Sequence, residues 1–415
     1  MPSCLKCAIT AAMVFGWAMI SPAHAGDWSL KESFEQKLLL DDNLGNLADS
    51  KGWVFSPMST LTSELMYAMP EGNFVLTNDL LFQQFFGPGS DSLKTIYPAP
   101  NIEALLTKNG PRSHLTLNAK YSSRQIRETD PFEFIDCIPI PGTNLVDCPD
   151  DRGVVEPLPI FQRSNSSKLS AKISYGYDIG PRDSVTLANA YNMTNYNGLG
   201  DDYWNNNITV VYQRRLTKRL DGTLGFGINW LSVANNRNLD RYTYNANAKL
   251  VKRINGRLSV HAGTSLFLAN SIQDGLPPIT SRTSDLRFNG SGNVGFDLLM
   301  DPATTLTFDA TVFTQQFQDS DYLQRLSTTA ALTHNINERS FARISGNFSL
   351  NEFAQAGGGT DVAMFVSVQP SYSIDLAKDW NMLASYKFVY IDTGNDSIIS
   401  NEVAITLTHD FYLFH

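Results

Sequence analysis

The chain has 415 residues, a formal net charge of -9 and four cysteines. The acidic surplus is spread along the chain without a basic stripe, which argues against nucleic acid as a partner. Beyond the N-terminus no run of about 18 apolar residues occurs, so we expect no transmembrane helix.

The N-terminus has the pattern of a secretory signal peptide. Lys6 supplies the positive region, residues 7–20 are mostly apolar, and Ala23-His24-Ala25 fits the small-residue cleavage pattern. We therefore expect a signal peptide over residues 1–25, cleaved after Ala25. A retained membrane anchor is the alternative, but the apolar run is short for a spanning helix.

From there onward the dominant pattern is a period of two, in which apolar residues alternate with polar ones, as in half-buried strands. Leu224, Phe226, Ile228 and Trp230, for example, alternate with Thr223, Gly225, Gly227 and Asn229. Such rows occupy Leu169–Tyr177, Leu224–Trp230, Tyr242–Leu250, Leu258–Leu268, Leu286–Leu298, Leu306–Val312, Ala342–Leu350, Val362–Ile374 and Trp380–Tyr390.

Two kinds of connector alternate between these rows. Short ones, such as Met69–Gly72, Ile179–Arg182 and Ala377–Asp379, contain turn-forming residues in most cases. Longer polar ones include Asp41–Gly52, Gly87–Ala99, Gln125–Asn165, Thr194–Trp204, Ala269–Ser284, Asn351–Asp361 and Thr393–Ser400. This rhythm is typical of outer-membrane barrels, whose short turns face the periplasm and whose long loops face outside.

The rhythm predicts an all-β fold: one closed antiparallel transmembrane β-barrel over residues 26–415, with about 18 strands and both ends periplasmic. The count is least certain before residue 165, where Asn101–Thr107 reads as a short strand, and 16 strands is the alternative. The 125–165 stretch reads as a long loop within this single domain. A soluble β-rich secreted protein remains a further alternative.

Two cysteines remain after the predicted cleavage, Cys137 and Cys148, in a Pro-rich and acidic stretch. A loop disulfide between them fits an oxidising compartment. Two free thiols or part of a metal site are the alternatives, although no Cys-x-x-Cys or nearby His supports a metal.

The polar rows carry Ser, Thr, Asn and Gly together with charges of both signs, a composition suited to a wet lumen. Aromatic residues near strand ends, such as Trp53, Tyr67, Tyr177, Trp230 and Trp380, suit the membrane–water interfaces. The charged residues expected to face the lumen are Lys168, Lys172, Arg241, Lys249, Arg287, Asp297, Asp309, Arg325, Arg343, Asp375 and Lys387.

Both ends of the predicted barrel carry resemblances to known families. The ending Phe411-Tyr412-Leu413-Phe414-His415 resembles the aromatic C-terminal strand that outer-membrane proteins present to the barrel assembly machinery, except that His415 follows the last aromatic. The stretch Ser33–Asn43, reading SFEQKLLLDDN, resembles the opening strand of porin-like barrel families found near exopolysaccharide and exosortase genes. The second resemblance implies an accessory role in export.

Motifs for nucleophilic catalysis, nucleotide binding or metal binding are not evident: no G-x-S-x-G, H-E-x-x-H or P-loop occurs. We therefore expect no enzyme activity, no cofactor and no metal. Because barrel enzymes assemble their sites from separate strands, spacing alone does not settle this point, and His261 and Asp309 both belong to inward rows.

The sequence thus predicts an outer-membrane, porin-like passive channel for small hydrophilic solutes, in which the 125–165 loop folds inward as a constriction. The expected partners are outer-membrane lipid, lipopolysaccharide and the assembly machinery. The alternatives are an accessory barrel for exopolysaccharide export or surface assembly, with export-system partners, and a plugged structural barrel or barrel enzyme. The solute and the oligomeric state do not follow from the sequence.

Overall fold

The structure is a computed structural model that describes residues 27–42, 52–87, 99–126, 138–139, 146–147, 154–155, 164–197, 202–234, 239–273, 283–316, 322–354, 360–392 and 397–414. The predicted signal peptide, Cys137 and Cys148 lie outside these ranges. Within them, no helix is long and apolar enough to cross a membrane.

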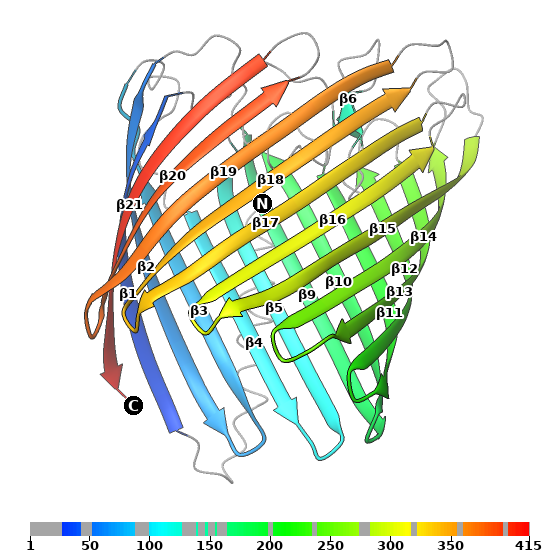
Figure 1. Ribbon diagram of the computed structural model, residues 1–415, viewed down its shortest axis with the longest axis horizontal. Helices are drawn as coiled ribbons and strands as arrows, with labels where there is room; N and C mark the ends of the chain where they lie inside the picture. The colour runs from blue at the N-terminus through cyan, green and yellow to red at the C-terminus, as the bar shows by residue number, and fades with distance from the viewer. Residues whose placement is uncertain are drawn as a thin grey trace.

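Eighteen strands form one antiparallel sheet that closes into a barrel (Figure 1). The first five are β1 (Asp27–Asp41), β2 (Val54–Met69), β3 (Gly72–Gln83), β4 (Ala99–Asn109) and β5 (Ser113–Ile126). The others are β9 (Ser164–Gly180), β10 (Asp183–Asn197), β11 (Asp202–Thr217), β12 (Leu220–Ala234), β13 (Leu239–Arg253), β14 (Leu258–Gln273), β15 (Thr283–Asp301), β16 (Thr304–Gln316), β17 (Tyr322–Asn337), β18 (Ser340–Ala354), β19 (Thr360–Ala377), β20 (Trp380–Asp392) and β21 (Ser397–Phe414).

Each of these strands pairs with its neighbours in the barrel, and β1 closes the circle by pairing with both β2 and β21. The prediction of a closed antiparallel barrel with about 18 strands is therefore confirmed. Closure leaves no free sheet edge, which a membrane demands because unpaired backbone groups are costly in lipid. Three two-residue strands, β6 (Ile138–Pro139), β7 (Val146–Asp147) and β8 (Val154–Val155), pair separately from the barrel.

Short turns join the strands at one end of the barrel, the lower end in Figure 1, which we call the turn end. The opposite end is the loop end. At the first turn Gly72 lies so close to the backbone of Thr107 on β4 that a Cβ atom at position 72 would overlap its carbonyl group. Only glycine fits there, so this turn can lie flat against the neighbouring strand.

The two faces of the sheet differ in burial, which identifies the inside of the barrel. Phe226, Ile228 and Leu224 on one face of β12 remain 48–62% exposed. Leu231, on the other face of the same strand, is fully buried, and so is Ser56 on the matching face of β2. Side chains crowd together on the concave face of a barrel and spread apart on the convex one, so the exposed apolar rows face outward.

Aromatic side chains gather on the outer face near both ends of the strands. Trp28 and Tyr67 pack in a tilted arrangement at the turn end, with ring centroids 4.6 Å apart. Toward the loop end Trp230 lies between Trp204 and Tyr242, at 4.4 and 5.6 Å. Two such aromatic levels are what a barrel places at the two membrane–water interfaces.

Some polar side chains interrupt the apolar outer face. On β1 Glu32 lies in the outer row between Leu30 and Phe34, and its carboxylate accepts a 2.7 Å hydrogen bond from Ser63. Elsewhere on the outer face, on the paired strands β10 and β11, Asn189 donates to Asn206 at 2.8 Å. These groups satisfy part of their hydrogen-bonding capacity on the sheet itself, which lowers the cost of facing lipid.

Candidate functional site

The candidate site is the inner face of the barrel, which is lined by polar and charged side chains from all of its walls. The strand register places all eleven charged residues predicted for the lumen in inward rows. For Arg241 and Arg287 this statement concerns the backbone only. Whether any of the eleven contacts a passing solute stays a prediction.

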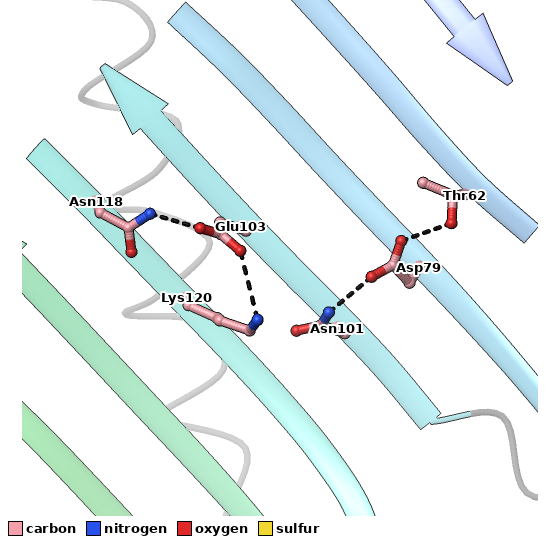
Figure 2. A network of polar contacts seen from close by, with 6 residues as sticks. All are labelled: Thr62, Asp79, Asn101, Glu103, Asn118 and Lys120. Carbon is pink, nitrogen blue, oxygen red and sulfur yellow. Dashed lines mark hydrogen bonds and ion pairs between the residues drawn. The ribbon is translucent and has the colours of Figure 1, made fainter. Parts of the chain in front are cut away.

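On the wall formed by β2, β3 and β4 the inward charges are acidic. Asp79 accepts hydrogen bonds from the Thr62 hydroxyl at 2.8 Å and the Asn101 amide at 2.7 Å (Figure 2). On β4 Glu103 accepts a 2.6 Å bond from Asn118 and lies 3.4 Å from the Lys120 ammonium group. The two carboxylates are thus held in defined positions.

The next wall, formed by β5 and β9, carries three inward lysines, with Asp178 in the same row of β9 nearer the turn end. Lys120 lies on β5, and Lys168 and Lys172 lie in the inward row of the paired strand β9. Acidic and basic side chains therefore face the lumen from adjacent walls, with Glu103 and Lys120 at the boundary between them. Such segregation creates a field across the lumen that a charged or dipolar solute would experience.

Sequence reasoning missed Asp79, Glu103 and Lys120, because the strand boundaries before residue 165 were its weakest part. A signal for them exists. Leu76 and Leu80 on β3, and Ile102 and Leu106 on β4, are spaced as outer-face residues, which leaves Asp79 and Glu103 in the inward rows.

On the far wall His261 on β14 and Asp309 on β16 form a close pair, with 2.6 Å between Nε2 and Oδ1. Gly295 on the intervening strand β15 leaves the space in which the two side chains meet. Within the described ranges, no hydroxyl or thiol is hydrogen-bonded to either residue. The same ranges contain no cluster of three or more His, Cys, Asp or Glu side chains suited to a metal.

Comparison with known proteins supports the fold at low sequence identity. The structure of OccAB4 from Acinetobacter baumannii is similar with a TM-score of 0.51 and 9% identity, over 95% of this chain and 100% of that one. OpdL from Pseudomonas aeruginosa gives a TM-score of 0.50 and 9% identity over 94% and 99% of the two chains. OpdO from the same organism gives 0.50 and 11% over 94% and 98%.

These three solved structures are outer-membrane β-barrel porins, and the present chain has their fold class. No protein-family model matches the sequence, and no curated protein does so either.

Proposed function

We propose that this protein is an outer-membrane, porin-like channel that lets small hydrophilic solutes pass. The observation that carries the proposal is the separation of the two faces: apolar side chains cover the outside of a closed ring of 18 strands, and hydrogen-bonding groups line the inside. A barrel of this size is wide enough for an aqueous path. The similar solved structures are porins, which favours a channel over an accessory role in exopolysaccharide export.

The orientation of the barrel in the membrane is inferred from the lengths of its connections. The turn end would face the periplasm and the loop end the outside, as short turns and long loops do in this class. A cleaved signal peptide would deliver the chain to that membrane. N-terminal sequencing of the protein from isolated outer membranes should then begin at Gly26.

Acidic and basic side chains both line the lumen, so weak selectivity between anions and cations is expected. The acidic wall around Asp79 and Glu103 attracts cations, whereas Lys120, Lys168 and Lys172 attract anions. Substitution of Asp79 and Glu103 by Asn and Gln should move the reversal potential in a KCl gradient toward anion preference. A matched pair on the outer face, Asn189→Ser with Asn206→Ser, should leave the reversal potential unchanged.

Conductance in planar lipid bilayers tests the proposal. The full chain, extracted in detergent and shown to be folded by its heat-modifiable gel mobility, should open stable steps of current in KCl. The same preparation after boiling serves as the control and should open none. A folded protein that never conducts would rule out the channel.

A further inference from the structure

Four consecutive short turns at the turn end carry an excess of positive charge. They join β4 to β5, β9 to β10, β11 to β12 and β13 to β14, which are neighbours in the barrel wall. Ten exposed cations lie within residues 108–113, 178–183, 214–221 and 252–257, and we call them the basic rim: Lys108, Arg112, Arg182, Arg214, Arg215, Lys218, Arg219, Lys252, Arg253 and Arg257. The same stretches contain three carboxylates: Asp178, Asp183 and Asp221.

The rest of the turn end has the opposite balance of charge. The other four short turns, within residues 67–74, 299–306, 335–342 and 374–381, hold two cations and five carboxylates: Arg339, Lys378, Glu71, Asp301, Glu338, Asp375 and Asp379. The whole chain is acidic, with a formal net charge of -9. The basic rim is therefore a local feature of one arc of the barrel and does not reflect the general composition.

The carboxylates of these stretches neutralise only part of the basic rim. Asp221 is shared by two guanidinium groups, 3.1 Å from Arg253 and 3.8 Å from Arg215. Asp183 lies 3.5 Å from Arg214. Among the residues that the structure describes, the other cations of the rim have no carboxylate within ion-pair distance: Lys108, Arg112, Arg182, Lys218, Arg219, Lys252 and Arg257. This surplus creates a positive potential at the surface, which attracts anions.

Two cations of the basic rim lie on the outer face of the barrel, among apolar side chains. Arg214 shares an outward register row with Gly222 and Leu250, and Lys252 lies two residues beyond Leu250 on the same face. A Cβ atom at Gly222 would lie 3.2 Å from Leu216 and 3.5 Å from Leu250, so the two leucines meet above this glycine. They are 46% and 51% exposed. The cations are thus adjacent to side chains suited to contact with lipid.

This arrangement restricts the kind of anion that fits. A soluble acidic partner could reach the tips of the turns, but Arg214 and Lys252 lie beside leucines on the face that meets the bilayer. A lipid satisfies both features, because its acyl chains contact the leucines while its headgroup stays at the level of the cations. Phosphate oxygens accept charge-assisted hydrogen bonds from guanidinium and ammonium groups. Cations without carboxylate partners favour a headgroup with net negative charge over a zwitterionic one.

We infer that the basic rim is a docking surface for anionic phospholipids in the leaflet that surrounds the turn end. In the proposed orientation this is the periplasmic leaflet. The inference rests on the proposed placement in the outer membrane, and it goes beyond the channel because no solute has to pass. Two exposed isoleucines at neighbouring turns, Ile179 and Ile254, extend the apolar border along the same arc.

Native mass spectrometry of the folded full chain in detergent tests the inference. The probes are dioleoylphosphatidylglycerol and dioleoylphosphatidylcholine, which share their acyl chains and differ in net charge. Each lipid is titrated, and the fraction of protein with bound lipid is measured. Phosphatidylglycerol should bind at concentrations at least about tenfold lower than phosphatidylcholine, as expected when several Lys and Arg side chains face an anionic headgroup.

Variants locate the binding. Lys218→Gln with Lys252→Gln removes two charges from the basic rim without breaking an ion pair, and should weaken binding of phosphatidylglycerol about tenfold. Arg339→Gln with Lys378→Gln is the matched control: it removes the same charge from the same end of the barrel, outside the rim, and should bind like the wild type. If the rim variant lacks heat-modifiable mobility, the comparison of the two lipids on the wild type carries the test.

Two soluble probes distinguish a lipid from other anions. Glycerol 3-phosphate carries a phosphate without acyl chains, and pentaglutamate represents an acidic protein segment. Both should bind at least about tenfold more weakly than phosphatidylglycerol, because neither contacts the leucines. If either bound as tightly as the lipid, and lost this binding in the rim variant, the rim would belong to a soluble partner and the inference would be wrong.

The remaining outcomes separate this inference from the proposed channel. Equal binding of the two lipids by the wild type, or equal loss of binding in the rim variant and its control, overturns the docking surface. Neither readout depends on conduction. A barrel that prefers phosphatidylglycerol but never conducts removes the channel and leaves the docking surface, whereas a conducting barrel without a lipid preference does the reverse.

Discussion

Nε2 of His261 lies 2.6 Å from Oδ1 of Asp309, although the two residues belong to strands separated by a third. The strand between them contributes Gly295 at this level, and a Cβ atom there would come within 2.7 Å of His261 and 2.6 Å of Asp309. The hydrogen bond between His261 and Asp309 thus depends on a glycine, Gly295, in the strand between them.

Replacement of Gly295 by alanine should destabilise the barrel by about 1–3 kcal/mol, as overpacking does elsewhere. The added methyl group would also meet the carbonyl oxygen of Phe308 at 2.5 Å, which is backbone and cannot turn away. Urea unfolding in vesicles, followed by tryptophan fluorescence, measures the effect. Gly292→Ala on the same strand is the control, because its nearest contact would be an ordinary 3.9 Å. Equal stability of the two variants would contradict this account of Gly295.

The seam between β1 and β21 is closed by side chains at both of its ends. Toward the loop end Asp42 accepts two 2.6 Å hydrogen bonds from Asn401, one from its backbone N–H and one from its amide. Toward the turn end Lys31 lies 2.8 Å from Asp410, with both side chains about one third exposed.

We expect the Asp42–Asn401 contact to contribute more to the stability of the barrel than the Lys31–Asp410 pair. Asp42→Ala should cost about 1–3 kcal/mol, because it leaves two donors unmet. Asp410→Asn should cost about 1 kcal/mol or less, since solvent screens the pair. The same unfolding assay ranks them, and a larger loss for Asp410→Asn would show that the seam is held mainly at the turn end.

Glu32 is an acidic side chain in an otherwise apolar stretch of the outer row of β1. Residues 28 to 32 of a strand tilted by about 40° rise about 10 Å, so Glu32 would lie inside the hydrocarbon region if Trp28 marks its boundary. Glu32→Leu should therefore leave stability in vesicles unchanged or raise it by up to about 2 kcal/mol. Phe226→Glu, on the outer face of β12, should lower it. A clear loss of stability for Glu32→Leu would mean that the carboxylate has a favourable role there.

The predicted bond between Cys137 and Cys148 lies outside the described residues and needs its own test. An oxidising compartment favours the disulfide. Alkylation of the unfolded protein before and after reduction, read by mass spectrometry, should label these two cysteines only after reduction. If the loop that they close narrows the lumen, reduction should also change the single-channel conductance. Labelling without reductant would show two free thiols.

From Leu169 onward, alternation of residue types was sufficient to predict most of the strands and their faces. Rows such as Leu224–Trp230 and Trp380–Tyr390 lie within β12 and β20 with the expected side outward. The alternation works because lipid and water lie on opposite sides of each strand in the membrane, so every second residue is selected for one or the other.

Strand ends were less predictable from sequence. Thr194–Trp204 reads as one loop, yet β10 extends to Asn197 and β11 begins at Asp202. Likewise β14 extends to Gln273, inside the expected loop that starts at Ala269. Near the loop end both faces of a strand can be polar, so the backbone pairing continues where the alternation has already stopped.

The details of the candidate site were the least predictable. The contact of His261 with Asp309, and of Asp79 with Asn101, depends on which strands are neighbours and on their register. Neither is encoded by local spacing, because the partners are joined by strand pairing and not by sequence distance.

The central claim is that the apolar face of each strand is outside and the polar face inside, and spin labels on three consecutive residues test it most directly. Nitroxides are attached to single cysteines at Ile208, Thr209 and Val210 of β11, in a chain whose four native cysteines are replaced. In vesicles, labels at 208 and 210 should collide mainly with dissolved oxygen, and the label at 209 mainly with a water-soluble nickel chelate. Equal accessibility at all three positions, or the reverse pattern, would contradict the account.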